Sequence, residues 1–242
     1  MSNVLAPRRL LRLIGSDARN VGRDPILFVA LCISVLPALL IFFFRAQLDA
    51  AGAAIGMAGF ADIAGAFALA LPAFLIGWVT GFLLLEDRDD GPLMAMEVTP
   101  IGKGGFLIYR TGVTAAISFL LGLGTCWAIF PGTALGIALL LSAMLAMEAV
   151  TVAFLLLALA GNKVEGLALS KLLNFAAIAP VLAALPWTWR YAGGVIPSFW
   201  IGEALHLSPG DALPLPAVLL AGTAVHVAVV GLSLWLALRR IG

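Results

Sequence analysis

The sequence predicts an all-α integral membrane protein with six transmembrane helices, from its composition and from its apolar runs. Of the 242 residues, 62% are hydrophobic and only 11% are charged, and the mean hydropathy is +1.10. Soluble domains are less apolar, with roughly half of their residues apolar. Six runs reach the length of about 20 mostly apolar residues that a span needs. They cover residues 25–44, 63–85, 106–129, 133–160, 167–189 and 213–238.

The segments between these runs are short, so residues 1–242 are predicted to form a single membrane domain. They leave no room for an attached ATPase, kinase or binding domain. The first run lies too far from residue 1 and is too long for a cleaved signal sequence, so we expect it to be retained. The net charge is +1, and no basic tract is interleaved with aromatic residues, so we expect no nucleic-acid partner.

The first 24 residues combine arginines with apolar side chains. This mixture predicts a basic interfacial helix, whose apolar residues enter the headgroup boundary while its arginines contact anionic lipid. The alternative is a frayed cytosolic tail. The arginines are Arg8, Arg9, Arg12, Arg19 and Arg23.

Lysine and arginine are distributed unequally between the two sides of the predicted spans. With the N-terminus in the cytoplasm, all of the 14 Lys and Arg residues fall on the inner side except Arg45 and Arg190. Positively charged loops stay in the cytoplasm. Since the number of spans is even, we expect both termini to be cytoplasmic.

Residues 86–105 form a long polar interruption between the second and third apolar runs. Four acids, Glu86, Asp87, Asp89 and Asp90, directly follow the second run. The partial negative charge of a helix C-terminus disfavours carboxylates there. We therefore expect these acids to have partners.

A short helix of about two turns is predicted within this interruption. Its start has a capping acid followed by glycine and proline, and its end has a residue before a proline, which avoids helical geometry. These positions are Asp89 or Asp90, Gly91, Pro92 and Pro100. One side of the helix carries Leu93, Met96 and Glu97. Apolar side chains framed by acids at a membrane surface favour a docking element over a catalytic one.

The order of acid cluster, glycine, short helix and Thr99-Pro100-Ile101 resembles the first cytoplasmic loop of ABC-2 type transporter permeases. More loosely, residues 162–166 with Lys171 resemble the second cytoplasmic loop, and residues 196–200 resemble the outer segment before the last span. Drug-export permeases of the fluoroquinolone type are the nearest group. The alternative is an ordinary solvated loop between two spans.

The resemblance implies a permease subunit of an ATP-driven exporter in the bacterial inner membrane. A hydrophobic or amphipathic small molecule, a drug or a lipid, would be its cargo. A second permease copy, identical or merely similar, would complete the path, and residues 1–24 would form an elbow helix. The residues that would couple to a separate ATPase are Glu86, Asp87, Asp89, Asp90, Gly91, Leu93, Met96 and Pro100. ATP and Mg would bind that ATPase, since no phosphate loop occurs in this chain.

The outer segment, residues 190–213, mixes apolar residues with Glu203, His206 and Asp211. It is too short and too polar to span a membrane. We expect it to lie in the interface or to dip into the membrane and return, with Trp187 and Trp200 among the aromatic anchors at headgroup depth. The resemblance implies short re-entrant helices here, above the substrate path.

Glu148 lies well inside the fourth apolar run, with no positive residue within a helical turn. A buried acid in lipid is costly and usually has a role. Three roles stay open: a protonated side chain bonded to Thr151 or to a hydroxyl on another helix, a contact to substrate in the transport path, or a proton relay.

The other polar residues point to no catalytic or metal site. The two histidines, His206 and His226, lack Cys or acidic neighbours at ligand spacing. Cys32 and Cys126 fall inside apolar runs and are expected to act as small hydrophobic residues. We therefore expect no resident metal or cofactor and no enzymatic activity in this chain.

Two other functional classes remain as alternatives to the permease. An intramembrane lipid-modifying enzyme would use Glu148, His226 or His206, but the sequence shows no converging acid and base. A proton-driven secondary carrier would use Glu148, but such carriers carry more intramembrane charges and an internal repeat.

Overall fold

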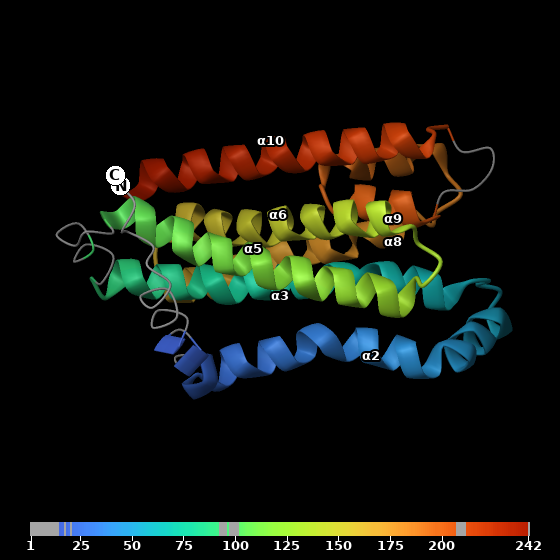
Figure 1. The fold of residues 1–242 in the computed structure, drawn as a ribbon, viewed down its shortest axis with the longest axis horizontal. Coiled ribbons are helices and arrows are strands. Elements are labelled where there is room, and N and C mark those ends of the chain that lie inside the picture. The colour runs from blue at the N-terminus through green and yellow to red at the C-terminus, as the bar shows by residue number, and fades with distance from the viewer. Residues whose placement is uncertain are drawn as a thin grey trace.

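Six helices that are long and apolar enough to cross a membrane run beside one another in the computed structural model (Figure 1). The structure describes residues 15–16, 18–19, 21–91, 96, 102–206 and 212–241, and these residues form no strand. The predicted all-α fold with six spans is confirmed. Five of them are α2 (Pro25–Ala54), α3 (Phe60–Asp89), α5 (Gly102–Ile129), α6 (Leu135–Leu159) and α10 (Leu215–Ile241). The other begins with α7 (Lys163–Phe175) and ends at Leu182.

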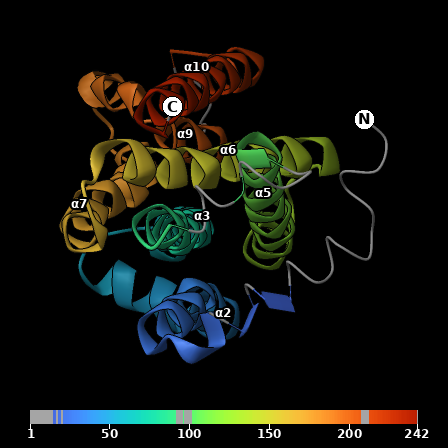
Figure 2. The same ribbon diagram turned by 90° about the vertical axis from the view of Figure 1, so that its left-hand side faces the viewer.

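The helix α3 forms the centre of the bundle. Viewed end-on, α2, α5, α6 and α7 surround it, and α10 lies outside α6 (Figure 2). In its most apolar stretch 94% of α3 is buried, against 22% of α10. The outer helices therefore leave large apolar faces for lipid or for another protein. The surface of α3, in contrast, is covered almost entirely by the other helices of the bundle.

Glycine residues allow α3 and α6 to approach each other closely. Gly77 and Gly81 are one helical turn apart on the α6 side of α3. A Cβ atom on Gly81 would lie 2.6 Å from Leu156 Cδ1, and one on Gly77 would lie 2.9 Å from Val152 Cβ. Small residues four positions apart are a common device for packing membrane helices. Side chains larger than hydrogen at these positions would force the two helices apart.

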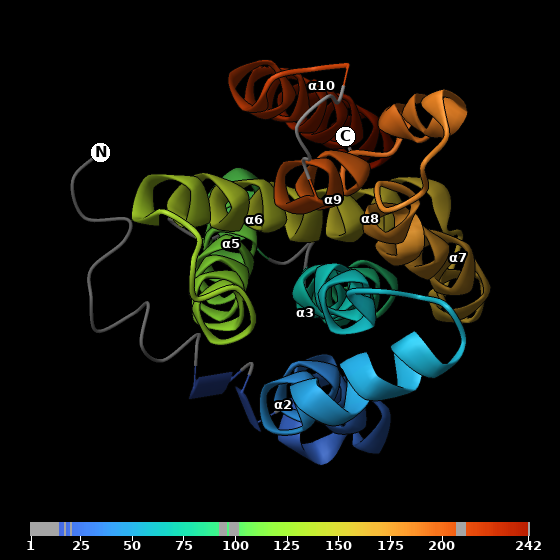
Figure 3. The ribbon, with the colours of Figure 1, turned by 90° about the vertical axis from the view of Figure 1, so that its right-hand side faces the viewer.

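The first span is kinked at Phe44, the residue at which the predicted span ends. Phe44 has non-helical backbone angles (φ −119, ψ 23), and the helix then continues to Ala54. The chain beyond Phe44, expected as a loop, is thus largely helical and turns across the end of the bundle (Figure 3). Arg45 ties it down by an ion pair with Asp62 and a 2.7 Å hydrogen bond to the Ile129 carbonyl.

The fifth span is shorter and less regular than predicted. After α7 the chain passes through a 3-10 turn, η2 (Ala176–Ile178), into the single helical turn α8 (Ala179–Leu182). Pro180 lacks a backbone N–H and starts this new turn instead of continuing α7. The prediction that the span reaches Trp189 is wrong, because the helical stretch ends at Leu182.

The outer segment folds into two short helices, η3 (Thr188–Val195) and α9 (Phe199–His206). Phe199 and Ile201 of α9 are buried. Trp200 donates a 2.8 Å hydrogen bond to the Gly194 carbonyl. Trp187 and Trp189 stack on each other at 4.9 Å and are exposed.

The helix α3 ends four residues later than predicted, so the acids that follow the second apolar run belong to its last turn. Asp89 is its last residue, and Asp90 is its C-cap, with its N–H donating to the Glu86 carbonyl. Gly91 has a left-handed backbone (φ 91), as is common just past a helix end. The prediction that Asp89 or Asp90 starts a new helix is wrong.

The remainder of the predicted short helix lies mostly outside the described residues. Leu93 and Pro100 are among those outside, whereas Met96 is described as part of a 3-10 turn. Of the predicted interfacial helix, residues 15–16, 18–19 and 21–23 are described and helical.

Candidate functional site

The last turn of α3 carries four consecutive charged residues, which contact three other elements of the bundle. We call Glu86, Asp87, Arg88, Asp89 and the C-cap Asp90, with the partners Arg110 and Lys163, the α3 charge cluster. Its members come from α3, α5 and α7. The cluster lies at the end of the bundle where α2 and α7 begin and where α10 ends (Figure 1).

Asp87 forms a buried ion pair with Arg110 of α5. The Asp87 Oδ2 and Arg110 Nη2 atoms lie 2.6 Å apart, and both side chains are largely shielded from solvent. The guanidinium of Arg110 also lies over the Phe106 ring, 5.0 Å from its centre, an attractive arrangement for a cation. Asp87 thus has a partner within the chain, although it was expected to contact another protein.

Arg88 donates to the carbonyl oxygens that end α6. Its Nη1 lies 3.2 Å from Leu157 O and 3.0 Å from Ala160 O, and its Nη2 lies 2.9 Å from Gly161 O. The last carbonyls of a helix have no partner within the helix and carry its partial negative charge. A guanidinium suits both needs. Sequence reasoning missed this role, because nothing in the sequence places Arg88 beside a helix end some 70 residues away.

Glu86 and Asp89 have weaker contacts at the surface. Glu86 Oε2 lies 3.5 Å from Lys163 Nζ, and Lys163 also lies 3.8 Å from Asp24 at the start of α2. Asp89 accepts a 3.0 Å hydrogen bond from Arg88 Nε. Exposed pairs of this kind contribute about 0–1 kcal/mol each. Glu86, Asp89 and Asp90 stay accessible from outside the bundle.

Met96 contacts the bundle instead of standing free of it. It is half-buried and packs against a cluster of buried residues that includes Leu84 of α3, Phe106 of α5 and Ala153 of α6. Met96 itself is therefore in contact with the bundle.

Glu148 faces His226 of α10 across the helix interface. Glu148 Oε2 and His226 Nε2 lie 3.2 Å apart, with side-chain exposures of 3% and 1%. The other ring nitrogen, Nδ1, lies 2.7 Å from the Gly222 carbonyl and donates to it. The two facing atoms are within ion-pair distance but not aligned as a hydrogen bond. Glu148 therefore does have an ionisable neighbour, a histidine rather than the hydroxyl that was considered.

A second buried acid lies at the opposite end of the bundle. Glu203 of α9 accepts hydrogen bonds from Arg190 Nη2 at 2.9 Å and from the Tyr191 hydroxyl at 2.8 Å. Arg190 also donates to the Leu185 carbonyl at 3.0 Å. Burial first, and the bond to Glu203 second, raise the pKa of Tyr191 above its ordinary value of 10.0. We call Arg190, Tyr191 and Glu203 the outer cluster.

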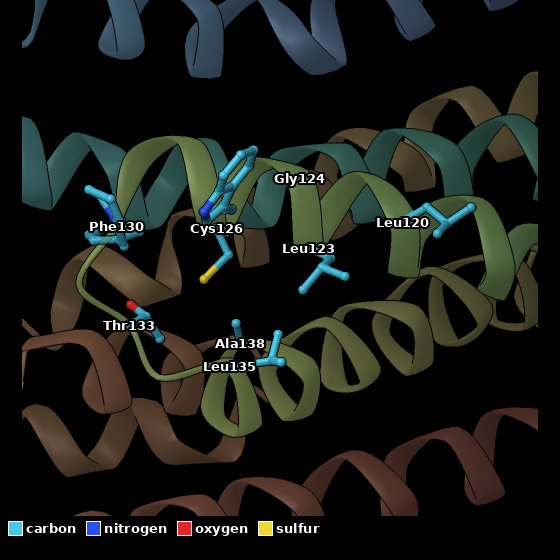
Figure 4. A pocket seen from close by; sticks show the side chains of 10 residues that line it. Leu120, Leu123, Gly124, Cys126, Phe130, Thr133, Leu135 and Ala138 are labelled. Carbon is cyan, nitrogen blue, oxygen red and sulfur yellow. The ribbon is translucent and has the colours of Figure 1, made fainter.

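Three apolar cavities open between the spans. The first, of about 550 Å³, lies between α5 and α6, and the Cys126 side chain points into it (Figure 4). The second, of about 410 Å³, lies between α2, α3 and α5 and has the buried Thr80–Thr114 hydrogen bond in its wall. The third, of about 520 Å³, lies between α2, α3 and α7. None of the three is lined by Glu148.

The third cavity, which we call the α2–α7 groove, has polar groups on otherwise apolar walls. Two buried polar atoms at this groove, Trp78 Nε1 and Asn174 Oδ1, have no hydrogen-bond partner among the described residues. Ser170 and the exposed Lys171 complete the polar part of the lining. Trp78 and Asn174 thus bring a donor and an acceptor without partners in the described residues to the same groove as the Lys171 cation.

A family model matches residues 17–234, which include the first five spans, most of the sixth and every residue of the two clusters. The family is described as fluoroquinolones export permease protein Rv2686c-like. The chain belongs to this family. The sequence resemblance to export permeases of the fluoroquinolone type is thereby confirmed.

Two similar curated proteins carry the same description. They are the fluoroquinolones export permease proteins of Mycobacterium tuberculosis strains H37Rv and CDC 1551. Each is 28% identical to this chain over 257 residues, covering 99% of this chain and 96% of the relative. No solved structure matches the chain. The family and the six apolar helices identify a multi-pass membrane permease.

Proposed function

We propose that this chain is the membrane-spanning subunit of an ATP-driven exporter whose cargo is an amphipathic drug of the fluoroquinolone class. The family match over residues 17–234 carries this proposal, since the relatives are named as exporters of these compounds. ATP and Mg²⁺ would bind a separate ATPase subunit. A second permease copy, identical or similar, would cover part of the apolar surface that α2, α7 and α10 expose.

The ATPase would dock at the accessible acids of the α3 charge cluster. Glu86, Asp89 and Asp90 present negative charge at the end of α3, just before residues 92–100 in the sequence. Met96, within those residues, packs against buried residues of the bundle. The coupling role of Gly91, Leu93 and Pro100 belongs to the same proposal.

The α2–α7 groove is the proposed place for the drug. Fluoroquinolones combine a flat aromatic ring system with a carboxylate. The ring system fits between the apolar side chains of α2 and Trp78, and the carboxylate fits the ammonium of Lys171. A hydrogen bond between charged groups is the stronger kind, so Lys171 would orient the molecule.

The cluster end of the bundle is proposed to face the cytoplasm of a bacterial cell. Arg88, Lys103, Lys163, Arg239 and Arg240 lie at that end, against Arg45 and Arg190 at the other. Single cysteines at Val164 and Val195, both strongly exposed, test this in a background without Cys32 and Cys126. An impermeant maleimide should label Val195→Cys in intact cells, and Val164→Cys only after lysis.

Transport into inside-out vesicles tests the function itself. Vesicles that hold the permease and its ATPase should accumulate fluorescent fluoroquinolone when ATP is supplied, and Lys171→Gln should weaken the apparent affinity for drug roughly tenfold. Arg239→Gln, which removes a cation from α10 far from the groove, is the matched control. ATP-independent uptake would contradict the proposal.

A proton-driven carrier is the second candidate, and the buried Glu148–His226 pair favours it. A titratable pair inside the membrane is the kind of group that proton relays use. A lipid-modifying enzyme would use Glu148, His226 or His206. The first two face each other on α6 and α10, whereas His206 lies on another helix, α9. Uptake that a protonophore abolishes, and that does not need ATP, would support the carrier.

A further inference from the structure

Arg88 joins the last turn of α3 to the turn between α6 and α7. One side chain reaches three successive parts of that turn: Leu157 inside α6, Ala160 at its C-cap and Gly161 just beyond it. The side chain is 17% exposed, so the contact is mostly shielded from water.

We propose that Arg88 is a positioning residue that transmits movement of the end of α3, residues 86–90, to α6 and α7. This inference rests on the proposed function, in which an ATPase moves the end of α3. It adds the mechanical step by which such a movement would reach the drug-binding groove.

The geometry of the contact makes it stiff. A guanidinium is a planar fork with fixed N–H directions, and here two of its nitrogens are bonded to carbonyls on a rigid helix end. Arg88 Nε is directed at Asp89 Oδ1, 3.0 Å away, which restrains the fork from the other side. Arg88 therefore cannot move along the bundle without moving the end of α6 or breaking three bonds.

The turn that Arg88 holds is itself restrained. Asn162 caps α7 by accepting a 2.9 Å hydrogen bond from Glu165 N, and Glu165 Oε2 accepts a 2.7 Å bond from Gly161 N. This reciprocal arrangement resembles a capping box. Gly166 in the first turn of α7 lies directly against α3, because an added Cβ would stand 2.6 Å from Leu85 Cδ1. The turn thus moves as one body with the start of α7.

The helix α7 carries this movement to the groove. Leu167, Ser170, Lys171 and Asn174 of α7 form one wall of the α2–α7 groove. They begin one residue after Gly166, the contact with α3. A displacement of the α3 end through Arg88 would therefore change the separation between α7 and α2.

The neighbouring link through Lys163 is a poorer candidate for this role. Its Nζ atom lies 3.5 Å from Glu86 and 3.8 Å from Asp24, and all three side chains are substantially exposed. Such a pair exchanges partners with water at little cost. Lys163 therefore provides a matched control for Arg88 at the same end of the bundle.

The test compares Arg88→Gln, Arg88→Lys and Lys163→Gln in the complete complex with its ATPase, reconstituted into vesicles. Arg88 is not one of the accessible acids proposed to dock the ATPase, so Arg88→Gln should keep ATPase copurification and basal ATP hydrolysis. It should lower drug-stimulated hydrolysis and transport on the order of tenfold, the size typical of lost coupling. Arg88→Lys keeps the charge at the α6 end but lacks the fork, so it should not restore coupling. Lys163→Gln should behave like the parent.

Each other outcome overturns the inference. Parental transport by Arg88→Gln would show that the contact transmits nothing. A parallel loss of thermal midpoint and ATPase copurification in Arg88→Gln, rescued by Arg88→Lys, would show a purely structural role for the charge. If Arg88→Gln does not fold, Arg88→Lys alone tests the inference. Coupled transport by Arg88→Lys would show that the planar guanidinium is not needed and would overturn the inference. A parent without ATP-dependent transport would instead refute the proposed function on which the inference rests.

Discussion

The α3 charge cluster and the outer cluster are both built on an arginine and an acid, yet they connect different parts of the chain. In the outer cluster Arg190 bonds Leu185 and Glu203, and all three fall within one short segment. In the α3 charge cluster Asp87 reaches α5, and Arg88 reaches the end of α6. The outer cluster stabilises a local cap, whereas the α3 charge cluster joins separate spans.

The two clusters also differ in what they leave exposed. Glu203 is 1% exposed, so the outer cluster keeps its charge inside the fold. The α3 charge cluster keeps one pair inside, Asp87 with Arg110, and leaves Glu86, Asp89 and Asp90 accessible. A region that both links spans and presents charge outward is suited to receive a partner. A region that buries its charge is suited to hold a shape.

The largest expected effect is on stability, at the outer cluster. Glu203→Ala leaves the shielded Arg190 guanidinium without this carboxylate and should destabilise the outer segment by about 3–5 kcal/mol. Equilibrium unfolding in mixed micelles measures the loss. Asp62→Ala, which breaks the exposed pair with Arg45, is the control and should cost about 0–1 kcal/mol. Equal losses of unfolding free energy in the two variants would contradict the claim that the buried pair stabilises the protein more than the exposed pair.

Asp87→Asn should have the next largest effect, of about 3 kcal/mol, because it breaks the shielded pair with Arg110. The exchanged pair, Asp87→Arg with Arg110→Asp, should recover part of this loss, and a double-mutant cycle measures how much. No recovery would mean that Asp87 stabilises the bundle through other contacts than this pair.

Glu148→Gln should have a smaller effect on stability. Polar contacts between membrane helices contribute about 0.6 kcal/mol on average, and glutamine keeps the size of the side chain beside His226. We expect normal expression and ATP-dependent transport, so Glu148 would serve to hold α10 on α6. Transport that is lost while folding is retained would place Glu148 in the substrate path or in a proton relay.

The smallest effect is the pH dependence of the outer cluster. The raised pKa of Tyr191 means that the folded state favours the protonated phenol. The stability that Tyr191 contributes is fully present below the pKa of about 10 that a tyrosine has in the unfolded chain. It is lost as the pH rises through the higher pKa of Tyr191 in the folded protein. Tyr191→Phe should remove this loss above pH 10. An identical alkaline decline in both proteins would show that Tyr191 is not its source.

The number and places of the spans were predictable because lipid demands long apolar runs, which a sequence shows directly. Even the kink at Phe44 coincides with the end of the first apolar run. The long-range partners were not predictable. Arg88 and the end of α6, or Glu148 and His226, meet only because of how α3, α6 and α10 are placed in space, and no local pattern specifies that placement.

One close-packing signal was present in the sequence but was not used. Gly77 and Gly81, spaced by four residues, mark the face of α3 that meets α6. Together with Ala149 and Ala153 on α6, they indicate which two helices pack most tightly. The ends of helices were harder to predict than the spans, because Asp90 and Gly91 suit the end of one helix as well as the start of another.

Docking of the ATPase at the accessible acids of the α3 charge cluster is the central claim, and copurification of the two subunits tests it most directly. The variant Glu86→Lys with Asp90→Lys reverses two accessible acids and leaves the Asp87–Arg110 pair intact. Loss of a charge pair at an interface typically costs about 2–5 kcal/mol, so copurification should fall tenfold or more, as it should for Leu93→Asp. Asp62→Lys, at the opposite end of the bundle, should copurify like the parent. If the two cluster variants retain the ATPase and transport normally, the stretch 86–105 is not the docking element.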